Sequence, residues 1–151
     1  SGQPSAVPSA PTFREVTIPV QETFPEISAL PSTGKRKLAE GDFVGAQVDF
    51  KKYLEAMPDA PNSGEVSFWL GETYYVRQGY ADAADAYITS MRKAPRGIKA
   101  PDAMVRLAAA LRGLGQPAEA CKTLDSFPVQ FPNAPPSVRA KAQTEIARTG
   151  C

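Results

Sequence analysis

The sequence predicts an all-α fold, a right-handed α-solenoid of three helix pairs followed by a C-terminal capping helix. Three classes of position recur at a spacing of 37 residues: a proline that ends a unit, a small residue and a bulky residue. They are Pro58, Pro95 and Pro132; Ala46, Ala83 and Ala120; and Phe50, Tyr87 and Leu124. A fixed period of roughly 20 to 50 residues is typical of repeat architectures, in which each unit buries its apolar face against its neighbours.

The middle unit carries the most informative motif. Leu70-Gly71-x-x-Tyr74 is followed by Ala83 and Tyr87, and a proline ends the unit. This order and spacing match the tetratricopeptide repeat (TPR), a helix–turn–helix unit of about 34 residues. The small residue on the second helix lets the first helix approach closely, and the aromatic residue one turn later fills the space between them. We therefore predict a stack of TPR helix pairs, with the extra residues of each unit placed in the turns.

The individual elements follow from caps, breakers and periodicity. Residues 1–31 hold six prolines and are predicted to form a Pro-rich linker or tail, and residues 32–151 a TPR domain. Ser32, Asp42 and Ser63 are predicted to cap three helices at their N-termini, since a side-chain oxygen there can accept a free backbone N–H. The expected helices span 33–40, 43–57, 64–78, 80–94, 101–114 and 117–131, with a capping helix at 137–149. The repeats are then 33–58, 64–95 and 101–132.

The composition argues against several classes of function. The chain has 17 Lys and Arg against 16 Asp and Glu, so it lacks the basic surplus of a nucleic-acid-binding protein. It has no histidine, the commonest general base and metal ligand, and no phosphate-binding loop. No apolar run reaches the roughly 18 residues of a membrane span. We therefore expect a protein that is not an enzyme, holds no metal or cofactor and does not insert into a membrane.

The first helix of each TPR pair faces the concave side of the stack, which predicts a binding surface. Counting Leu70 as position 7 of its unit, we expect groove-facing side chains at positions 2, 5, 9 and 12. With Trp69 beside them, the predicted partner-binding residues are Glu65, Phe68, Trp69, Glu72, Tyr75, Asp102, Val105 and Arg112. Aromatic and aliphatic side chains edged by charge suit a helix or an extended segment of a protein. For Trp69, packing between repeats is an equal alternative.

Several segments together resemble one family. Ala39-Glu40-Gly41-Asp42-Phe43, Phe68-Trp69-Leu70-Gly71-Glu72 and Lys99-Ala100-Pro101-Asp102 resemble the C-terminal TPR domain of the Tol-Pal system protein YbgF, the cell division coordinator (CpoB) family. The resemblance covers residues 33–150, and the second and third segments are more specific than a general TPR pattern. The ending with Cys121 and Cys151 resembles alphaproteobacterial members.

The resemblance implies a periplasmic scaffold without enzymatic activity. Such a protein binds TolA and coordinates peptidoglycan synthesis with outer-membrane constriction during cell division, with a peptidoglycan synthase as a further partner. The resemblance also implies an export signal and a trimerising coiled coil upstream of the printed residues. Pro31 and Gly34 stand where the family has a longer helical run, so we expect a short first helix in the first repeat.

Cys121 and Cys151 are expected to form a disulfide. If helix 117–131 and the capping helix are antiparallel, the start of one and the end of the other lie at the same end of the hairpin. The resemblance supports the same pairing, which is typical of an oxidising compartment. The alternative is two unrelated thiols, one in the core and one on the tail.

Three other functions remain open at this point. The first is a TPR adaptor in outer-membrane protein or lipoprotein biogenesis. The second is a cytosolic chaperone-linked TPR protein; that class holds a terminal carboxylate with Lys, Arg and Asn, where Phe68 and Glu72 stand here. The third is a regulatory domain of an enzyme whose catalytic residues lie outside this sequence.

Overall fold

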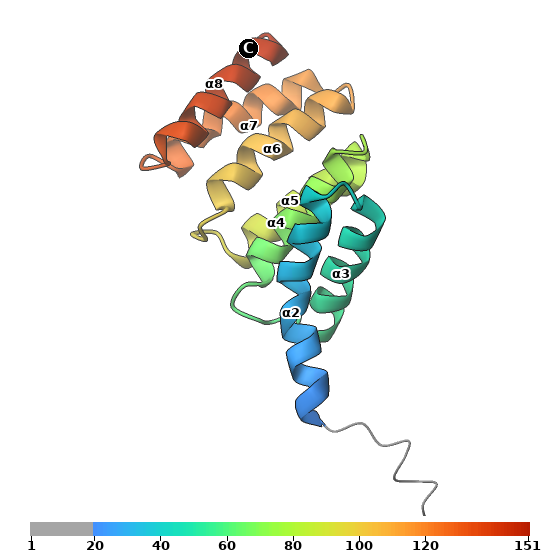
Figure 1. Ribbon diagram of the computed structural model, residues 1–151. Coiled ribbons are helices and arrows are strands. Elements are labelled where there is room, and N and C mark those ends of the chain that lie inside the picture. Colours follow the sequence, from blue (N-terminus) through green and yellow to red (C-terminus); the bar gives the residue numbers. More distant parts are fainter. Residues whose placement is uncertain (1–19) are drawn as a thin grey trace, which may run out of the picture.

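The computed structural model describes residues 20–151, with side chains from Glu26 onward. This part of the chain folds into seven α-helices and contains no β-strand (Figure 1). The helices are α2 (Val20–Ala39), α3 (Phe43–Ala56), α4 (Ser63–Tyr75), α5 (Tyr80–Lys93), α6 (Ala100–Gly113), α7 (Pro117–Gln130) and α8 (Pro136–Thr149). The predicted all-α solenoid of three helix pairs and a final helix is confirmed. No helix in the described range is both long and apolar enough to cross a membrane.

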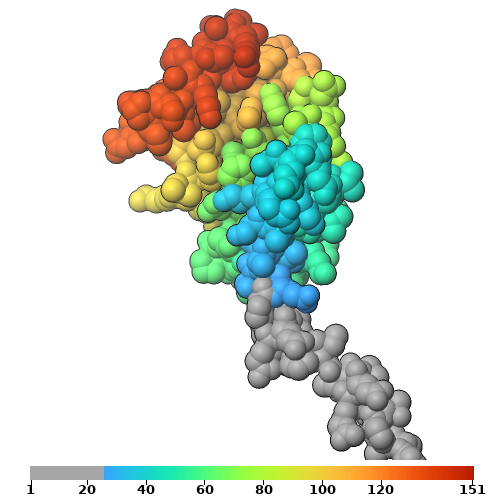
Figure 2. Space-filling view, in the orientation of Figure 1, coloured from blue at the N-terminus to red at the C-terminus, as the bar shows by residue number. Residues whose placement is uncertain are grey.

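The helices form two layers. Each helix packs on the next one in the chain, so that α2–α3, α4–α5 and α6–α7 are hairpins (Figure 1). Contacts between neighbouring repeats also join α2 to α4, α4 to α6 and α6 to α8, whereas within residues 20–151 no such contacts join α3, α5 and α7 to one another. The first helices of the pairs, continued by α8, therefore form the inner layer. In Figure 2, α2 in blue and α8 in red flank this face, with parts of α4 and α6 between them.

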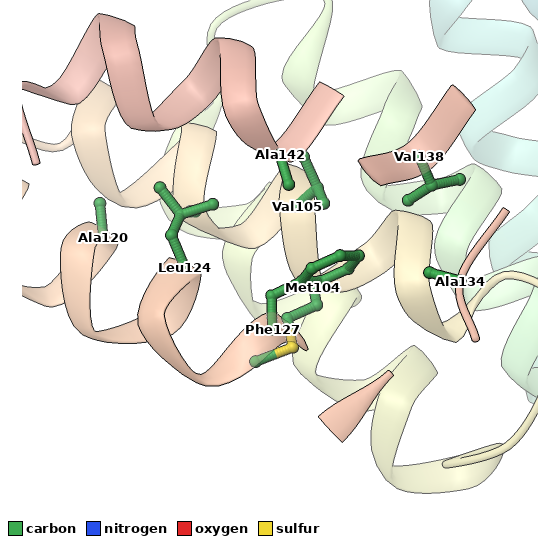
Figure 3. Close-up of a cluster of buried hydrophobic side chains, with 9 residues drawn as sticks. Met104, Val105, Ala120, Leu124, Phe127, Ala134, Val138 and Ala142 are labelled. Atoms are coloured by element: carbon green, nitrogen blue, oxygen red, sulfur yellow. The ribbon is translucent and has the colours of Figure 1, made fainter. Parts of the chain in front are cut away.

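Each repeat has its own apolar cluster. Phe50, Tyr87 and Leu124 occupy equivalent places in the three clusters and are at most 2% exposed. The predicted small residues of the second helices, Ala46, Ala83 and Ala120, are all 0% exposed. Figure 3 shows the third cluster, in which Leu124 and Phe127 of α7 lie among residues of α6 and α8. The stack thus has a continuous core to which each repeat contributes one section.

A second small residue, on the first helix of each pair, makes room for the bulky one. A Cβ atom on Gly34 would lie 2.5 Å from the Phe50 ring, and one on Gly71 would lie 2.5 Å from the Tyr87 ring. Such distances are far below van der Waals contact, so only glycine fits opposite these rings. The third repeat has Ala108 at this place, and its partner on α7 is the smaller Leu124.

The first helix is longer than predicted. The sequence predicted a helix over residues 33–40 capped by Ser32, but α2 begins at Val20 and contains Pro25 and Pro31. Each proline removes one helical hydrogen bond. Packing compensates for this loss, because Ile27 and Leu30 contact the first core cluster and Gly34 admits the Phe50 ring. The linker predicted for residues 1–31 lies partly outside the described residues, which begin at residue 20.

The predicted caps have mixed outcomes. Asp42 caps α3 as predicted, and its side chain accepts a hydrogen bond from the Gly45 N–H at 2.9 Å. Ser63 is instead the first residue of α4, and Asn62 takes the cap position. The Asn62 side chain does not cap the helix, because its Oδ1 accepts a hydrogen bond from the Tyr53 hydroxyl at 2.7 Å.

The turn inside each pair uses one left-handed residue. Gly41 and Gly115 have φ angles of 87° and 76° at equivalent positions, 74 residues apart. Gln78 lies midway between them in the sequence and has a φ of 64°. Gly79, the glycine that follows it between the predicted helices 64–78 and 80–94, has an ordinary φ of −80°. A side chain with a Cβ therefore occupies a position that favours glycine.

The C-terminus is tied to the third repeat. Cys121 and Cys151 form the predicted disulfide, with their sulfur atoms 2.17 Å and their Cα atoms 5.6 Å apart. Cys121 lies in the second turn of α7, and Cys151 follows the left-handed Gly150 that ends α8. The antiparallel arrangement of α7 and α8 brings these two ends of the helices together, so the bond fixes the end of α8.

Candidate functional site

A hollow of about 330 Å³ lies on the inner layer, between α4, α6 and α8. Apolar side chains alternate with charged ones along its walls. Its lining consists of Phe68, Trp69 and Glu72 of α4; Lys99 just before α6; Asp102, Val105, Arg106 and Ala109 of α6; and Val138, Lys141, Thr144, Glu145 and Arg148 of α8. Five of the eight predicted partner-binding residues therefore meet in one place.

The floor of the hollow belongs to the core. Phe68, Val105 and Val138 line it but are each only 4% exposed. The Phe68 ring stacks edge-to-face on Trp69, with centroids 5.2 Å apart, and its centroid lies 5.8 Å from that of Tyr87. Phe68 was predicted to face a partner. It lines the hollow, but most of its side chain is buried, so it offers a partner only a small exposed part of the floor.

Trp69 forms an aromatic wall with two cations beside it. The half-buried indole packs against the core clusters of both the first and the second repeat. The ammonium groups of Lys35 and Lys99 each lie 5.1 Å from the centre of the ring, and the indole N–H donates to Glu65 at 3.5 Å. Ammonium groups at this distance are attracted by the ring quadrupole. The ring therefore packs between repeats, as one interpretation expected, and also lines the hollow; its contact with a partner stays a prediction.

Glu72 is the centre of an internal hydrogen-bond network. Its carboxylate receives two bonds from the Arg106 guanidinium, at 2.9 and 3.2 Å, and one from the Tyr87 hydroxyl at 2.5 Å. The Arg106 guanidinium also lies 4.7 Å from the centre of the Tyr75 ring. Glu72 lines the hollow, but its carboxylate already accepts three hydrogen bonds from within the chain.

Burial and charge fix the protonation of this network. Burial raises the pKa of Tyr87 far above its ordinary value of 10.0, and the neighbouring Glu72 carboxylate raises it further. Burial alone would lower the pKa of Arg106, but the charge and hydrogen bonds of Glu72 outweigh it, so that this pKa is raised. Tyr87 therefore remains a neutral donor and Arg106 a cation over the whole physiological pH range.

Helix α8 forms a wall of the hollow as well as capping the stack. Glu145, which is 5% exposed, accepts hydrogen bonds from Arg112 of α6 at 3.1 Å and from Arg148 at 3.3 Å. Arg112 was predicted to face a partner. The structure shows instead that it connects α6 to α8 and does not line the hollow.

Two further predicted residues lie at the edges of the site. Glu65 contacts the indole N–H of Trp69 but is not part of the lining of the hollow. Tyr75 faces a separate hollow of about 640 Å³ near the α2–α3 turn, where its ring lies edge-to-face on Tyr80 with centroids 5.6 Å apart. Arg106 and Glu72 line both hollows.

The sequence prediction missed Lys99, Arg106 and the whole contribution of α8. A signal for α8 was available in the predicted helices, because their starts at residues 101 and 137 are 36 positions apart. The range of α8, 136–149, is that of α6 shifted by 36 residues, one fewer than the repeat period. With this shift the groove positions of Asp102 and Val105 correspond to Val138 and Lys141, which do line the hollow. A shift of 37 points instead to Arg139 and Ala142, which lie on the other side of α8, facing α7.

Comparisons with known proteins agree with this geometry. The tetratricopeptide repeat family matches residues 102–134. The TPR2B domain of yeast Sti1, solved in its complex with pHsp70, is similar in structure with a TM-score of 0.72 and 14% sequence identity, over 82% of this chain and 95% of that one. A TPR-like protein from Chlorobium tepidum gives a TM-score of 0.63 and 17% identity, over 82% and 92% of the two chains. A chain of the CopN–Scc3 complex gives 0.67 and 15%, over 94% and 87%. No curated protein matches the sequence.

These identities are low, so the structural likenesses concern the fold. Together with the repeat match on residues 102–134, they show that the chain has a TPR-like fold.

Proposed function

We propose that this chain is a protein-interaction domain that holds a segment of a partner protein in the hollow between α4, α6 and α8. One observation carries the proposal. Residues of two different repeats and of α8 converge on a single concave surface, whose floor is apolar and rigid and whose rim is charged. A preformed groove of this kind suits a helix or an extended segment, because little order has to be imposed when the segment binds.

The resemblance to the Tol-Pal protein YbgF leads us to a particular partner. The two more specific segments of the resemblance, which contain Trp69-Leu70-Gly71-Glu72 and Lys99-Ala100-Pro101-Asp102, contribute Trp69, Glu72, Lys99 and Asp102 to the same hollow. We propose that the domain binds the periplasmic part of TolA there and helps to coordinate outer-membrane constriction with peptidoglycan synthesis. A peptidoglycan synthase is the proposed second partner, and the full-length protein is proposed to be a trimer formed by an upstream coiled coil.

The disulfide supports the proposed location. A bond between Cys121 and Cys151 is stable in an oxidising compartment such as the periplasm and is rare in the cytosol. The groove chemistry argues in the same direction. A cytosolic chaperone-type site needs free cations to hold a terminal carboxylate, whereas here the corresponding positions hold the buried Phe68 and the already paired Glu72.

Calorimetric titration with the periplasmic part of TolA tests this function. Trp69→Ala removes the aromatic wall, and we expect at least a tenfold loss of affinity, which is typical of a buried aromatic anchor. Val129→Ala is the matched control, because Val129 is 82% exposed on α7 and outside the groove. Circular dichroism establishes that both variants are folded.

The outcomes separate the site from the partner. Failure of the wild-type domain to bind TolA would remove TolA as the partner and favour an adaptor role in outer-membrane protein or lipoprotein biogenesis. Binding by Trp69→Ala with unchanged affinity would show that TolA docks elsewhere on the surface.

A further inference from the structure

The charges of the groove are of two kinds, paired and unpaired. The carboxylates of Glu72 and Glu145 are each held by arginines of the same chain, at 2.9 to 3.3 Å. In contrast, Lys99 and Lys141 line the hollow without an ion pair to any carboxylate in the described part of the chain. Paired charges largely cancel at a distance. The charges left for a ligand are therefore mainly ammonium groups.

The positions of these lysines make their charge available inside the groove. Lys99 precedes α6 and lies beside the Phe68 and Trp69 rings, with its Nζ 5.4 and 5.1 Å from their centres. Lys141 belongs to α8, the opposite wall of the same hollow. Lys35 of α2 approaches the Trp69 ring as well, at 5.1 Å, so that two ammonium groups share one indole. Two like charges beside one ring repel each other, and an anion near both relieves the repulsion.

Two acidic groups lie in the same region. Asp102 lines the hollow without an ion pair in the described residues, and Glu65 accepts the indole N–H of Trp69. Three lysines thus face two carboxylates that they do not contact within 4 Å. A basic segment would add cations to this set. A wholly apolar one would bury the ammonium groups without partners, which is costly.

We propose that the groove selects an acidic segment of its protein partner. Side-chain carboxylates of the segment contact Lys99 and Lys141 on the two walls, and an apolar side chain lies between them on the floor formed by Phe68, Val105 and Val138. This inference rests on the proposed function, since it names the chemistry of the segment that the groove holds.

Trp69 is the only tryptophan of the chain, so its fluorescence reports directly on the groove. Three amidated octapeptides serve as probes: acidic acetyl-DELLDELL-amide, neutral acetyl-NQLLNQLL-amide and basic acetyl-KKLLKKLL-amide. We expect the acidic peptide to bind about tenfold more tightly than the neutral one at low salt, because each lysine contributes a few-fold at a partly exposed rim. We expect this advantage to shrink in about 0.5 M salt, where charges are screened within a few ångströms. The neutral peptide with a free C-terminal carboxylate tests whether a terminal carboxylate alone is enough.

The variant Lys99→Gln/Lys141→Gln removes the two charges and is expected to abolish the preference for the acidic peptide. Lys51→Gln/Lys52→Gln is the matched control, since these exposed lysines of α3 lie outside the hollow. Equal affinity for all three peptides, no Trp69 response to any of them, or an unchanged acidic preference in Lys99→Gln/Lys141→Gln would overturn the inference. If the neutral peptide with a free C-terminus bound tightly, the groove would recognise a terminal carboxylate, and recognition of acidic side chains would be wrong.

The two proposals fail separately. If TolA binds with an affinity that depends on Trp69 but not on Lys99, Lys141 or salt, the proposed function stands and the acidic selection is wrong. If the acidic peptide binds and TolA does not, the selection stands and the partner is wrong.

Discussion

The contact between Gly71 and Tyr87 allows a sharp test of how the repeats pack. Gly71 lies in the middle of α4, and a Cβ added there would meet three carbon atoms of the Tyr87 ring at 2.5, 2.7 and 3.0 Å. The ring cannot move away easily. It is 0% exposed, and its hydroxyl is held by Glu72 at 2.5 Å. Gly71→Ala therefore forces either the ring or the whole of α5 to shift.

The expected size of the effect follows from two opposing terms. Overpacking a rigid core costs about 1 to 3 kcal/mol. Alanine gains up to about 1 kcal/mol over glycine in the middle of a helix. We expect Gly71→Ala to lower the free energy of unfolding by about 1 to 2 kcal/mol. The third repeat shows how the cost can be removed, because there Ala108 faces the smaller Leu124.

A double-mutant cycle measures this coupling. Urea unfolding of the wild type, Gly71→Ala, Tyr87→Leu and the double variant is followed by circular dichroism and by Trp69 fluorescence. Tyr87→Leu alone costs several kcal/mol, since it leaves a cavity and removes the hydrogen bond from the Tyr87 hydroxyl to Glu72. In the double variant we expect a favourable coupling of about 1 to 2 kcal/mol. Additive effects within about 0.5 kcal/mol, or stabilisation by Gly71→Ala alone, would refute the packing argument.

Three further predictions concern single features. Gln78→Gly is expected to raise the free energy of unfolding by about 1 kcal/mol, because glycine adopts the left-handed φ of 64° with less strain than glutamine. A lower free energy of unfolding in urea would contradict this. Replacing both Cys121 and Cys151 by serine is expected to lower the free energy of unfolding by about 3 to 4 kcal/mol, because the disulfide closes a loop of 30 residues. Amide hydrogen exchange should increase first at the end of α8. An equal increase along the whole chain would count against this. Because the pKa of Tyr87 is raised in the folded state, its contribution to stability is present below the unfolded pKa of 10.0 and is lost as the pH rises above that value. Between pH 8 and 10.5, the free energy of unfolding of the wild type should therefore fall by about 1 kcal/mol more than that of Tyr87→Phe. Parallel curves of unfolding free energy against pH would disprove this.

The repeat period was sufficient to predict most of the helices. From α3 to α8 the observed bounds lie within three residues of the predicted ones, because prolines and glycines mark the ends of these helices. The period also contained the answer for α2. Shifting the range of α4, 63–75, back by 37 residues gives 26–38, which lies inside the observed α2, and places Gly34 opposite Phe50 as Gly71 is opposite Tyr87. The prediction missed this helix because it relied on the low helix propensity of Pro25 and Pro31. Propensity describes the destabilisation of a helix by proline, but it does not include the packing that offsets it.

The groove was predicted only in part. Counting TPR positions identified lining residues on both α4 and α6, because helix periodicity determines which side chains share a face. These residues are Phe68, Glu72, Asp102 and Val105. It could not show that Arg106 would pair with Glu72. The two residues are 34 positions apart and lie on different helices, so the pair forms only when α4 and α6 are stacked.

The sequence by itself thus determined the all-α repeat architecture and the inner face of its first helices, since both depend on spacing along the chain. It favoured the pairing of Cys121 with Cys151 over two separate thiols, and the antiparallel packing of α7 and α8 decided this question. The tertiary structure alone decided which of the groove charges are free. Arg112 and Glu72 are polar groove positions in the sequence, but contacts with α8 and α6 leave them paired, whereas Lys99 and Lys141 have no ion pair among the described residues. Whether a charge is available depends on which neighbour reaches it in space, and that is settled by the stacking of the helices.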